Sequence, residues 1–291
     1  MRVLILGGRG MLGSETAKRL RAAGALVKAP ERARLDGCDA RSAGEALDSF
    51  APDWVVNCAA ATDVDRCETQ TQWARRLNAG IPALWAKLCR ESGARFLQIG
   101  TDYVFDGRGN APLTEEDAAD PLNVYGATKY AGERATLSAG GTVLRVQWLY
   151  GRAKPGFVGW LCRQRQKSSI PVVADCTGVP TSAKEAARMI EALLFSGKTG
   201  LFHGAPAGAA SWMEFAKEIF AQIGENSEKL CPISQTALVR PAKRPRYTPF
   251  SNEKLCRETG FSARPWQAVL EEFLQECANE RPELPPGAWF D

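Results

Sequence analysis

The most constraining feature of the sequence is its first turn, where a short apolar run enters a glycine-rich loop. Residues 3–6 read VLIL, and the loop GGRGMLG then places Gly7, Gly10 and Gly13 at intervals of three residues. An apolar run without polar alternation is typical of a strand covered by helices on both faces. The glycine spacing is typical of a tight turn into a helix that packs closely on that strand. The chain is therefore expected to begin with a strand, a glycine-rich turn and a helix.

The same alternation continues over the first 150 residues. Strand-like runs follow at 25–29, 53–59 and 94–100, and helix-like segments lie at 11–23, 42–50 and 72–91. A further run, GTVLRVQWLYG at 141–151, is expected to form one strand. Short β-rich runs separated by helices indicate βαβ units in a parallel sheet. We predict an α/β fold with a Rossmann-type doubly wound parallel sheet over residues 1–150.

Beyond residue 150 the pattern becomes less regular. Prolines interrupt shorter helical segments, of which the clearest span 185–195, 212–223 and 266–277. We expect residues 151–291 to form a smaller C-terminal substrate-binding lobe, with some exchange of chain between the two domains. The tail from Arg281 carries three prolines and is expected to be peripheral, although Trp289 and Phe290 could dock it.

Composition excludes several classes of protein. The 37 Lys and Arg against 33 Asp and Glu leave a net charge of +4, and the densest basic stretch, 240–246, contains two prolines, so nucleic-acid binding is not expected. The single histidine, His203, makes a Ser-His-Asp hydrolase or a His-rich zinc site hard to assemble. Nine cysteines without a CxxC pair are typical of reduced thiols. With no apolar run of signal-peptide or membrane-spanning length, we expect a cytoplasmic protein without a membrane partner.

The glycine loop predicts a dinucleotide site, because its second glycine lets a pyrophosphate approach the backbone and the helix N-terminus supplies free N–H groups. The choice of nicotinamide depends on the end of the second strand, where an acidic residue would hold the ribose of NAD. Pro30 stands about there, while Arg9, with Lys28 or Arg32, could neutralise a 2′-phosphate. The sequence therefore favours NADPH, and Glu31 keeps NADH possible.

Two segments carry candidate catalytic groups. GTDYVFDG places Thr101, Asp102 and Tyr103 at the carboxyl edge of the sheet, where doubly wound folds bind ligands. NVYGATKYAGE places Tyr125 and Lys129 four residues apart, on one face of a predicted helix. A neighbouring ammonium should lower the pKa of Tyr125, whose side chain could then protonate a carbonyl oxygen as hydride arrives. Lys129 could also bind the cofactor ribose, and Thr101 the same carbonyl oxygen.

Together these segments resemble the extended short-chain dehydrogenases/reductases, and specifically the dTDP-4-dehydrorhamnose reductase family. The resemblance covers nearly the whole chain. The matching segments are GGRGMLGSE, NCAAATDVDRCE, GTDYVFDG, PLNVYGATKYAGE, VQWLYG, GVPT and RPRYTPFSNEKL.

The resemblance implies an NAD(P)H-dependent reductase of the 4-keto group of a nucleotide-linked 6-deoxy-4-keto sugar, in the first place dTDP-4-dehydrorhamnose reduced to dTDP-L-rhamnose. It implies Thr101, Tyr125 and Lys129 as catalytic residues. Substrate contacts are expected from Thr101, Asp102, Tyr103 and Trp148. Asp39 is a plausible acceptor for the adenine amino group. The full set expected at the dinucleotide is Gly7, Arg9, Gly10, Met11, Leu12, Gly13, Asp39, Ala40, Ala60, Ala61, Thr62, Tyr125 and Lys129.

Two further properties follow less directly from the resemblance. Glu15 matches a position at which some relatives bind magnesium between subunits, but a glutamate in the first turn of a helix is also favourable for the helix dipole. No metal is therefore expected. A homodimer is possible.

Departures from the family pattern leave other readings open. Gly156-Phe157, Asp175-Cys176 and Thr248-Pro249-Phe250 differ from the usual residues expected near the sugar nucleotide, so another nucleotide or deoxysugar is credible. A dehydratase would require a glutamate at Tyr103, and no second acid/base for an epimerase is found. The alternative from a different class is a non-catalytic, NADP-binding regulatory subunit of reductase fold.

Overall fold

The computed structural model describes residues 1–31, 35 and 37–290, and its centre is a parallel sheet of six strands. The strand order is β10-β5-β4-β3-β1-β2, in which the direction of winding reverses between β1 and β3. The strands are β1 (Arg2–Leu6), β2 (Leu26–Lys28), β3 (Trp54–Asn57), β4 (Arg95–Thr101), β5 (Thr142–Val146) and β10 (Gly200–His203). The predicted doubly wound parallel sheet is thus confirmed.

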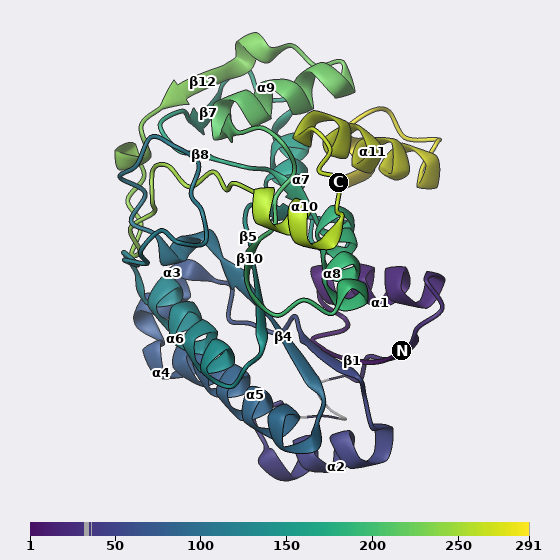
Figure 1. Ribbon diagram of the computed structural model, residues 1–291. Coiled ribbons are helices and arrows are strands. Elements are labelled where there is room, and N and C mark those ends of the chain that lie inside the picture. Colours follow the sequence, from purple (N-terminus) through teal and green to yellow (C-terminus); the bar gives the residue numbers. More distant parts are fainter. Residues whose placement is uncertain (32–34, 36, 291) are drawn as a thin grey trace.

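Helices cover both faces of this sheet (Figure 1). Successive residues of β1 point to opposite faces, so that Val3 and Ile5 join one buried cluster and Leu4 and Leu6 another. The helices of the first cluster are α1 (Met11–Ala22), α8 (Ala183–Ser196) and α10 (Glu253–Thr259). The second face carries α2 (Ala40–Phe50) and α5 (Ile81–Ser92). This double cover explains why β1 and β3 read as uninterrupted apolar runs.

One predicted helix, 72–91, is broken in the structure. It consists of α4 (Thr71–Arg75), a π-helical turn at Arg76–Gly80, and α5. Pro82 has no N–H to give to the carbonyl of Asn78, so regular α-helical bonding cannot pass this point. The Asn78 carbonyl instead lies so close to α6 (Val124–Ser138) that a Cβ at Gly132 would collide with it.

The predicted strand 141–151 is also wrong in its length. The chain leaves the sheet after Val146, and Trp148 adopts a left-handed conformation with φ of 45°. Two residues then form β6 (Leu149–Tyr150), which pairs with β9 (Thr181–Ser182) outside the main sheet. The indole of Trp148 stacks on Trp212 with ring centroids 3.6 Å apart, a contact that the local sequence does not predict.

The second half of the chain is shared between the sheet and a smaller lobe above it (Figure 1). Elements α8 and β10 return to the main sheet. The lobe has its own buried cluster, which includes Leu161, Phe215, Phe220 and Leu270. Its elements are α7 (Gly156–Gln164), β7 (Ile170–Val173), β8 (Thr177–Gly178), β11 (Ala210–Ser211), α9 (Trp212–Ile223), β12 (Leu230–Ile233) and α11 (Trp266–Glu280). Trp289 and Phe290 pack against this cluster and so hold the tail on the lobe.

Short helices complete the described chain. They are α3 (Val64–Thr69), which lies between β3 and α4, and 3₁₀ turns at Asp102–Val104, Ser227–Lys229, Gln235–Ala237 and Ala288–Phe290. Within the described ranges, no helix combines the length and the apolar composition that crossing a membrane would require.

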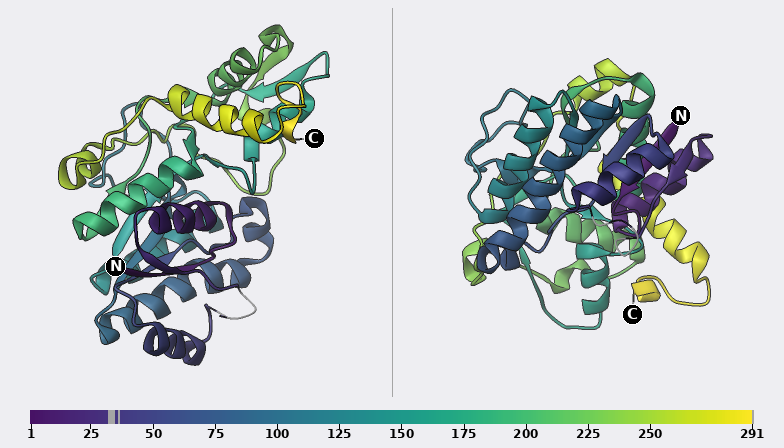
Figure 2. Two further views of the ribbon diagram at one scale, coloured as in Figure 1. Left: turned by 90° about the vertical axis from the view of Figure 1, so that its right-hand side faces the viewer. Right: turned by 90° about the horizontal axis from the view of Figure 1, so that it is seen from below.

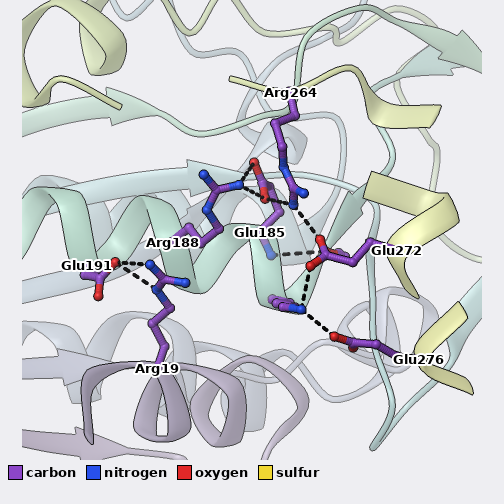
Figure 3. Close-up of polar contacts among 9 residues, drawn as sticks. Arg19, Glu185, Arg188, Glu191, Arg264, Glu272 and Glu276 are labelled. Atoms are coloured by element: carbon purple, nitrogen blue, oxygen red, sulfur yellow. Dashed lines mark hydrogen bonds and ion pairs between the residues drawn. The ribbon is translucent and has the colours of Figure 1, made fainter. Parts of the chain in front are cut away.

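Ion pairs tie α8 to its neighbours on both sides (Figure 3). Glu191 of α8 binds Arg19 of α1, and Lys184 binds Glu272 of α11 at 2.6 Å. Glu185 is completely buried and accepts from Arg188 and from Arg264, at 3.0 and 2.6 Å. A view turned by 90° shows α1, α8 and α11 stacked along one side of the molecule (Figure 2). These contacts fix the lobe relative to the sheet.

Asn78 offers a test of how the π-helical turn supports the fold. Its side chain accepts from Ala61 N at 2.8 Å and donates to Ala61 O at 3.1 Å, entirely within the protein. The Asn78→Ala variant should lose about 1–3 kcal/mol of unfolding free energy, because two buried backbone groups lose their partners. Denaturant unfolding measures this. The exposed Asn226→Ala is the control and should lose less than about 1 kcal/mol; equal losses would contradict the account.

Candidate active site

A cavity of about 850 Å³ runs along the carboxyl edge of the sheet. Its wall includes the last residues of β1, β3 and β4, and the position lies where the strand order reverses. Open α/β sheets bind ligands at this place, because the loops that leave neighbouring strands diverge there. The residues that line it cluster at 6–12, 57–60, 99–103 and 146–149, with Tyr125 and Lys129 from α6.

The glycine loop forms one wall of the cavity, and its glycines do what their spacing predicts. Gly7 has φ of 72°, and a Cβ there would lie 2.8 Å from Ala59 N. A Cβ at Gly13 would collide with the carbonyl of Gly7, so Gly13 sets how closely α1 approaches β1. Gly7, Arg9, Gly10, Met11 and Leu12 line the cavity, whereas Gly13 is buried behind it.

The end of β2 presents both charges expected there. Arg9 and Glu31 form an ion pair at the cavity, with side chains 75% and 42% exposed. Lys28 instead lies over the ring of Phe50, 5.6 Å from its centre. Arg32 lies outside the described residues. Of Arg9 and Lys28, Arg9 is the one that lines the cavity, and Glu31 is its partner there, so a contact between Arg9 and a 2′-phosphate stays a prediction.

Asp39 has a structural partner in this state. It begins α2, where its carboxylate accepts from Ser42 N at 2.8 Å and from Ser42 Oγ at 2.6 Å. These hydrogen bonds hold the pKa of Asp39 below its ordinary value. The adjacent residues Gly37 and Cys38 line the cavity, while Asp39 and Ala40 are not among its lining residues. A contact between Asp39 and adenine stays a prediction.

The loop after β3 contributes a second wall. Ala60 and Thr62 line the cavity. Ala61 is buried, and its backbone is clasped by the side chain of Asn78. Asn78 thus supports the loop from behind, a role the sequence analysis missed because a helical Asn gives no local signal for it.

Thr101, Tyr125 and Lys129 all line the same cavity. Thr101 is the last residue of β4, and Tyr125 is the second residue of α6. The approach of this helix is very close, since a Cβ at Gly126 would collide with the carbonyl of Tyr103. The Thr101 side chain lies near the Tyr125 phenol and favours its ionised form, and the Tyr125 and Tyr103 rings meet edge to face with centroids 5.4 Å apart.

Burial sets the protonation of these groups. The pKa of Tyr125 is raised, chiefly because burial disfavours the phenolate. Burial also lowers the pKa of Lys129 to about 8, and its ammonium donates to Ile99 O at 2.5 Å. The expectation of a lowered pKa for Tyr125 is therefore wrong, because burial outweighs the effect of the neighbouring lysine. Tyr125 keeps its proton at neutral pH, which is the form that donates to a carbonyl.

Asp102 lies directly beside Thr101 and is 2% exposed. Its carboxyl accepts from Thr248 Oγ1 at 2.8 Å, and burial raises its pKa to about 6. Tyr103 has a pKa raised to about 12 by burial and contacts Arg244, which binds Asp65 through both guanidinium nitrogens at 2.6 and 2.8 Å. Thr101, at the end of β4, and the two residues after it, Asp102 and Tyr103, thus all line the cavity, as predicted.

Trp148 forms the wall toward the C-terminal lobe. Its ring is held between Trp212 on one side and Gly178, where a Cβ would lie 2.5 Å from the indole. Gln147 beside it is buried, and its Oε1 accepts from Val179 N at 2.8 Å. The sequence did not indicate that Gln147 lines the cavity or that Trp212 supports Trp148 from behind, because both depend on contacts distant in sequence.

Within the described part of the chain, no three His, Cys, Asp or Glu side chains gather in a way that could hold a metal ion. Glu15 lies half-buried in the first half of α1.

A doubly wound sheet with a glycine loop, and with Thr, Tyr and Lys side chains in one cavity, defines a Rossmann-type reductase of the short-chain dehydrogenase/reductase kind. Comparison with known proteins gives the family. Residues 1–279 match the model described as RmlD substrate binding domain, and the chain belongs to this family.

Relatives match over almost their full lengths. A dTDP-4-dehydrorhamnose reductase of Streptomyces griseus is 36% identical, covering 98% of this chain and 97% of that protein. The Escherichia coli enzyme of the same name is 31% identical, with 95% and 98% covered. A dTDP-4-dehydrorhamnose reductase structure from Clostridium acetobutylicum superposes with a TM-score of 0.91 at 35% identity, covering 95% and 99%. One from Bacillus anthracis, in complex with NADP, gives 0.88 at 31%, covering 94% and 99%.

The raised pKa of Asp102 predicts a pH-dependent stability. Its value of about 6 lies above the ordinary 3.8, so the neutral carboxyl favours the folded state. This contribution is present below about pH 4 and is lost as the pH rises through 6. Relative to the wild type, Asp102→Asn should gain about 1–3 kcal/mol between pH 4 and pH 7. Chemical denaturation at several pH values measures the difference, and a constant difference would show that Asp102 does not titrate in this window.

Proposed function

We propose that the protein is an NADPH-dependent reductase of the 4-keto group of a nucleotide-linked 6-deoxy-4-keto sugar. The first candidate reaction converts dTDP-4-dehydrorhamnose to dTDP-L-rhamnose, as the names of the relatives suggest. The observation that carries the proposal is the meeting of Thr101 and a protonated Tyr125 in the cavity that the glycine loop opens into. A reductase requires a proton donor at that place.

The residues present fit a dinucleotide. The glycines at 7 and 10 leave room where Cβ atoms would crowd the backbone, and the N-terminus of α1 begins at the cavity wall. The helix dipole and free N–H groups there favour the pyrophosphate. Gly7 and Arg9 to Leu12 would hold the dinucleotide, with Ala60 and Thr62 on the opposite side. When bound, the nicotinamide supplies the hydride.

Two side chains of the protein act on the carbonyl oxygen of the substrate. Thr101 orients the carbonyl through its hydroxyl, and Tyr125 gives its proton to the oxygen as negative charge develops there. The high pKa of Tyr125 ensures that the proton is present at neutral pH. Lys129 binds the ribose of the cofactor, and its ammonium stabilises the phenolate left after transfer. We assign Asp102, Tyr103 and Trp148 to the sugar side of the cavity.

A different keto sugar is the second candidate. A dTDP-4-keto-6-deoxy-D-glucose reductase of Streptomyces niveus is 35% identical over 92% of this chain. Trp148 on the cavity wall would select among sugars, and its ring is held from behind by Trp212, which in turn packs against Phe157 with ring centroids 4.7 Å apart. We place the enzyme in the cytoplasm, because an odd set of nine cysteines without a CxxC pair is typical of reduced thiols.

The central test of the proposed function is Tyr125→Phe. Removing the phenolic proton donor should lower turnover of dTDP-4-dehydrorhamnose at least about 100-fold, while NADPH binding stays near that of the wild type. Loss of NADPH absorbance measures turnover, and tryptophan fluorescence measures binding. Tyr130→Phe, on the same helix, is the matched control and should remain active. Full turnover by Tyr125→Phe would remove this residue from the acid role.

The Arg9–Glu31 pair predicts how cofactor preference can be changed. Glu31→Gln frees Arg9 from its partner, so the ratio of kcat/KM for NADPH to that for NADH should rise several-fold. Arg9→Gln should lower the same ratio, because the cation opposite the 2′-phosphate is lost. Parallel assays with the two cofactors measure the ratio. Unchanged ratios in both variants would place the 2′-phosphate elsewhere.

A further inference from the structure

A row of buried charged and polar side chains lies behind the candidate active site. Glu133 on α6, Arg145 on β5 and His203 on β10 are 1%, 2% and 0% exposed. Arg145 clamps Glu133 with two hydrogen bonds, from Nε to Oε2 at 2.9 Å and from Nη2 to Oε1 at 2.5 Å. A cation and an anion are therefore held together without water, in a geometry that leaves neither carboxylate oxygen unpaired.

His203 contributes no charge to this row. Its Nδ1 lies 3.0 Å from Leu113 O, and since a carbonyl can only accept, Nδ1 carries the proton. Its Nε2 is then the acceptor for Arg145 Nη1 at 3.1 Å. Burial and the neighbouring guanidinium lower the pKa of His203 to about 3, so the ring is neutral. Of the two side chains in this row that are hydrogen-bonded to Arg145, Glu133 is the one that carries a negative charge.

Lys129 precedes Glu133 by one helical turn, and helical residues four apart lie on the same face. The Lys129 side chain is 4% exposed, and Glu133 favours its charged form against the cost of burial. Other titratable or charged groups around it come from several elements. These are Tyr125 on α6, Cys58 after β3, Asp102 and Tyr103 after β4, and Arg145 on β5.

None of these groups can take over the part of Glu133. Burial raises the pKa of the Cys58 thiol to about 12, so it is uncharged near neutrality. Asp102 acts on the pKa of Tyr125, whereas the groups that favour the charged form of Lys129 are Glu133 and Cys58. Arg145 is a cation and would oppose the charge on Lys129. Glu133 is thus the anion on which a charged, buried Lys129 depends.

We propose that Glu133, fixed in place by Arg145, is a positioning residue that keeps the ammonium of Lys129 charged inside the cavity. The consequence for catalysis rests on the proposed function, in which a charged Lys129 binds the ribose and supports Tyr125. The effect on Lys129 itself does not. It follows from the i, i+4 spacing of Lys129 and Glu133, the Arg145–Glu133 ion pair and the burial of all three side chains, and it can be measured without turnover.

Glu133→Gln tests the proposal in the full-length protein. Without the anion, the midpoint at which Lys129 loses its proton should fall by about one pH unit, given the strength of a partly screened charge pair. NMR of protein labelled at the lysine Cε carbons follows this titration, with Lys129→Met used to assign the signal. Glu133→Asp keeps the charge and should keep the midpoint near that of the wild type.

A matched control separates electrostatic from structural effects. Glu185 is as deeply buried as Glu133 and forms ion pairs with Arg188 and Arg264 (Figure 3), and it does not line the cavity. Glu185→Gln should lower stability without moving the Lys129 midpoint. If Glu133→Gln fails to fold, the apolar pair Glu133→Leu with Arg145→Leu replaces both charges. Its midpoint should also fall, because Glu133 outweighs Arg145 in its effect on Lys129.

Activity gives the second measurement. The decline of kcat/KM at high pH should move to lower pH in Glu133→Gln and stay in place in Glu133→Asp and Glu185→Gln. A shifted NMR midpoint with no turnover in any variant, the wild type included, supports the role of Glu133 and refutes the proposed function. An unmoved midpoint in Glu133→Gln overturns the role of Glu133, whatever the activity.

Discussion

The site depends on how closely α6 can approach the carboxyl end of β4. Gly126 allows the first turn of the helix to lie against the backbone of Tyr103, and Gly132 allows the next turns to lie against Asn78. Any side chain at either position would push the helix outward. Because Tyr125 and Lys129 lie on this helix and Thr101 ends β4, the same two contacts determine the distance between the three catalytic candidates.

Close packing also decides the charges. Burial raises the pKa of Tyr125 and of Asp102 and lowers that of Lys129, so each of these three groups is shifted toward its neutral form. For Tyr125 this shift suits reduction, since the proton must be present before the substrate oxygen becomes negative. For Lys129 the shift works against its proposed task, and Glu133, held in place by Arg145, partly offsets it. A charged Lys129 in the cavity thus depends on the buried carboxylate of Glu133.

Much of this arrangement could be predicted from local sequence. The glycine loop predicts a tight turn between the first strand and the first helix, and the spacing of Tyr125 and Lys129 places both on one helix face. The sequence could not show that Trp148 leaves the sheet, because its partner Trp212 lies 64 residues later. Arg244 reaches Tyr103 and Asp65 from a segment that is still more remote in sequence. The sign of the Tyr125 pKa shift was also misjudged, because burial, which outweighs the lysine, is a property of the whole fold.

The most direct test of the account follows the hydride itself. The protein would be incubated with dTDP-4-dehydrorhamnose and NADPH that carries deuterium at the transferable position of the nicotinamide, and the nucleotide sugar would be analysed by mass spectrometry and NMR. The account predicts one deuterium per product molecule, bound to carbon 4 of the sugar. A sugar recovered unchanged while NADPH binds normally, or a product without deuterium at carbon 4, would contradict it.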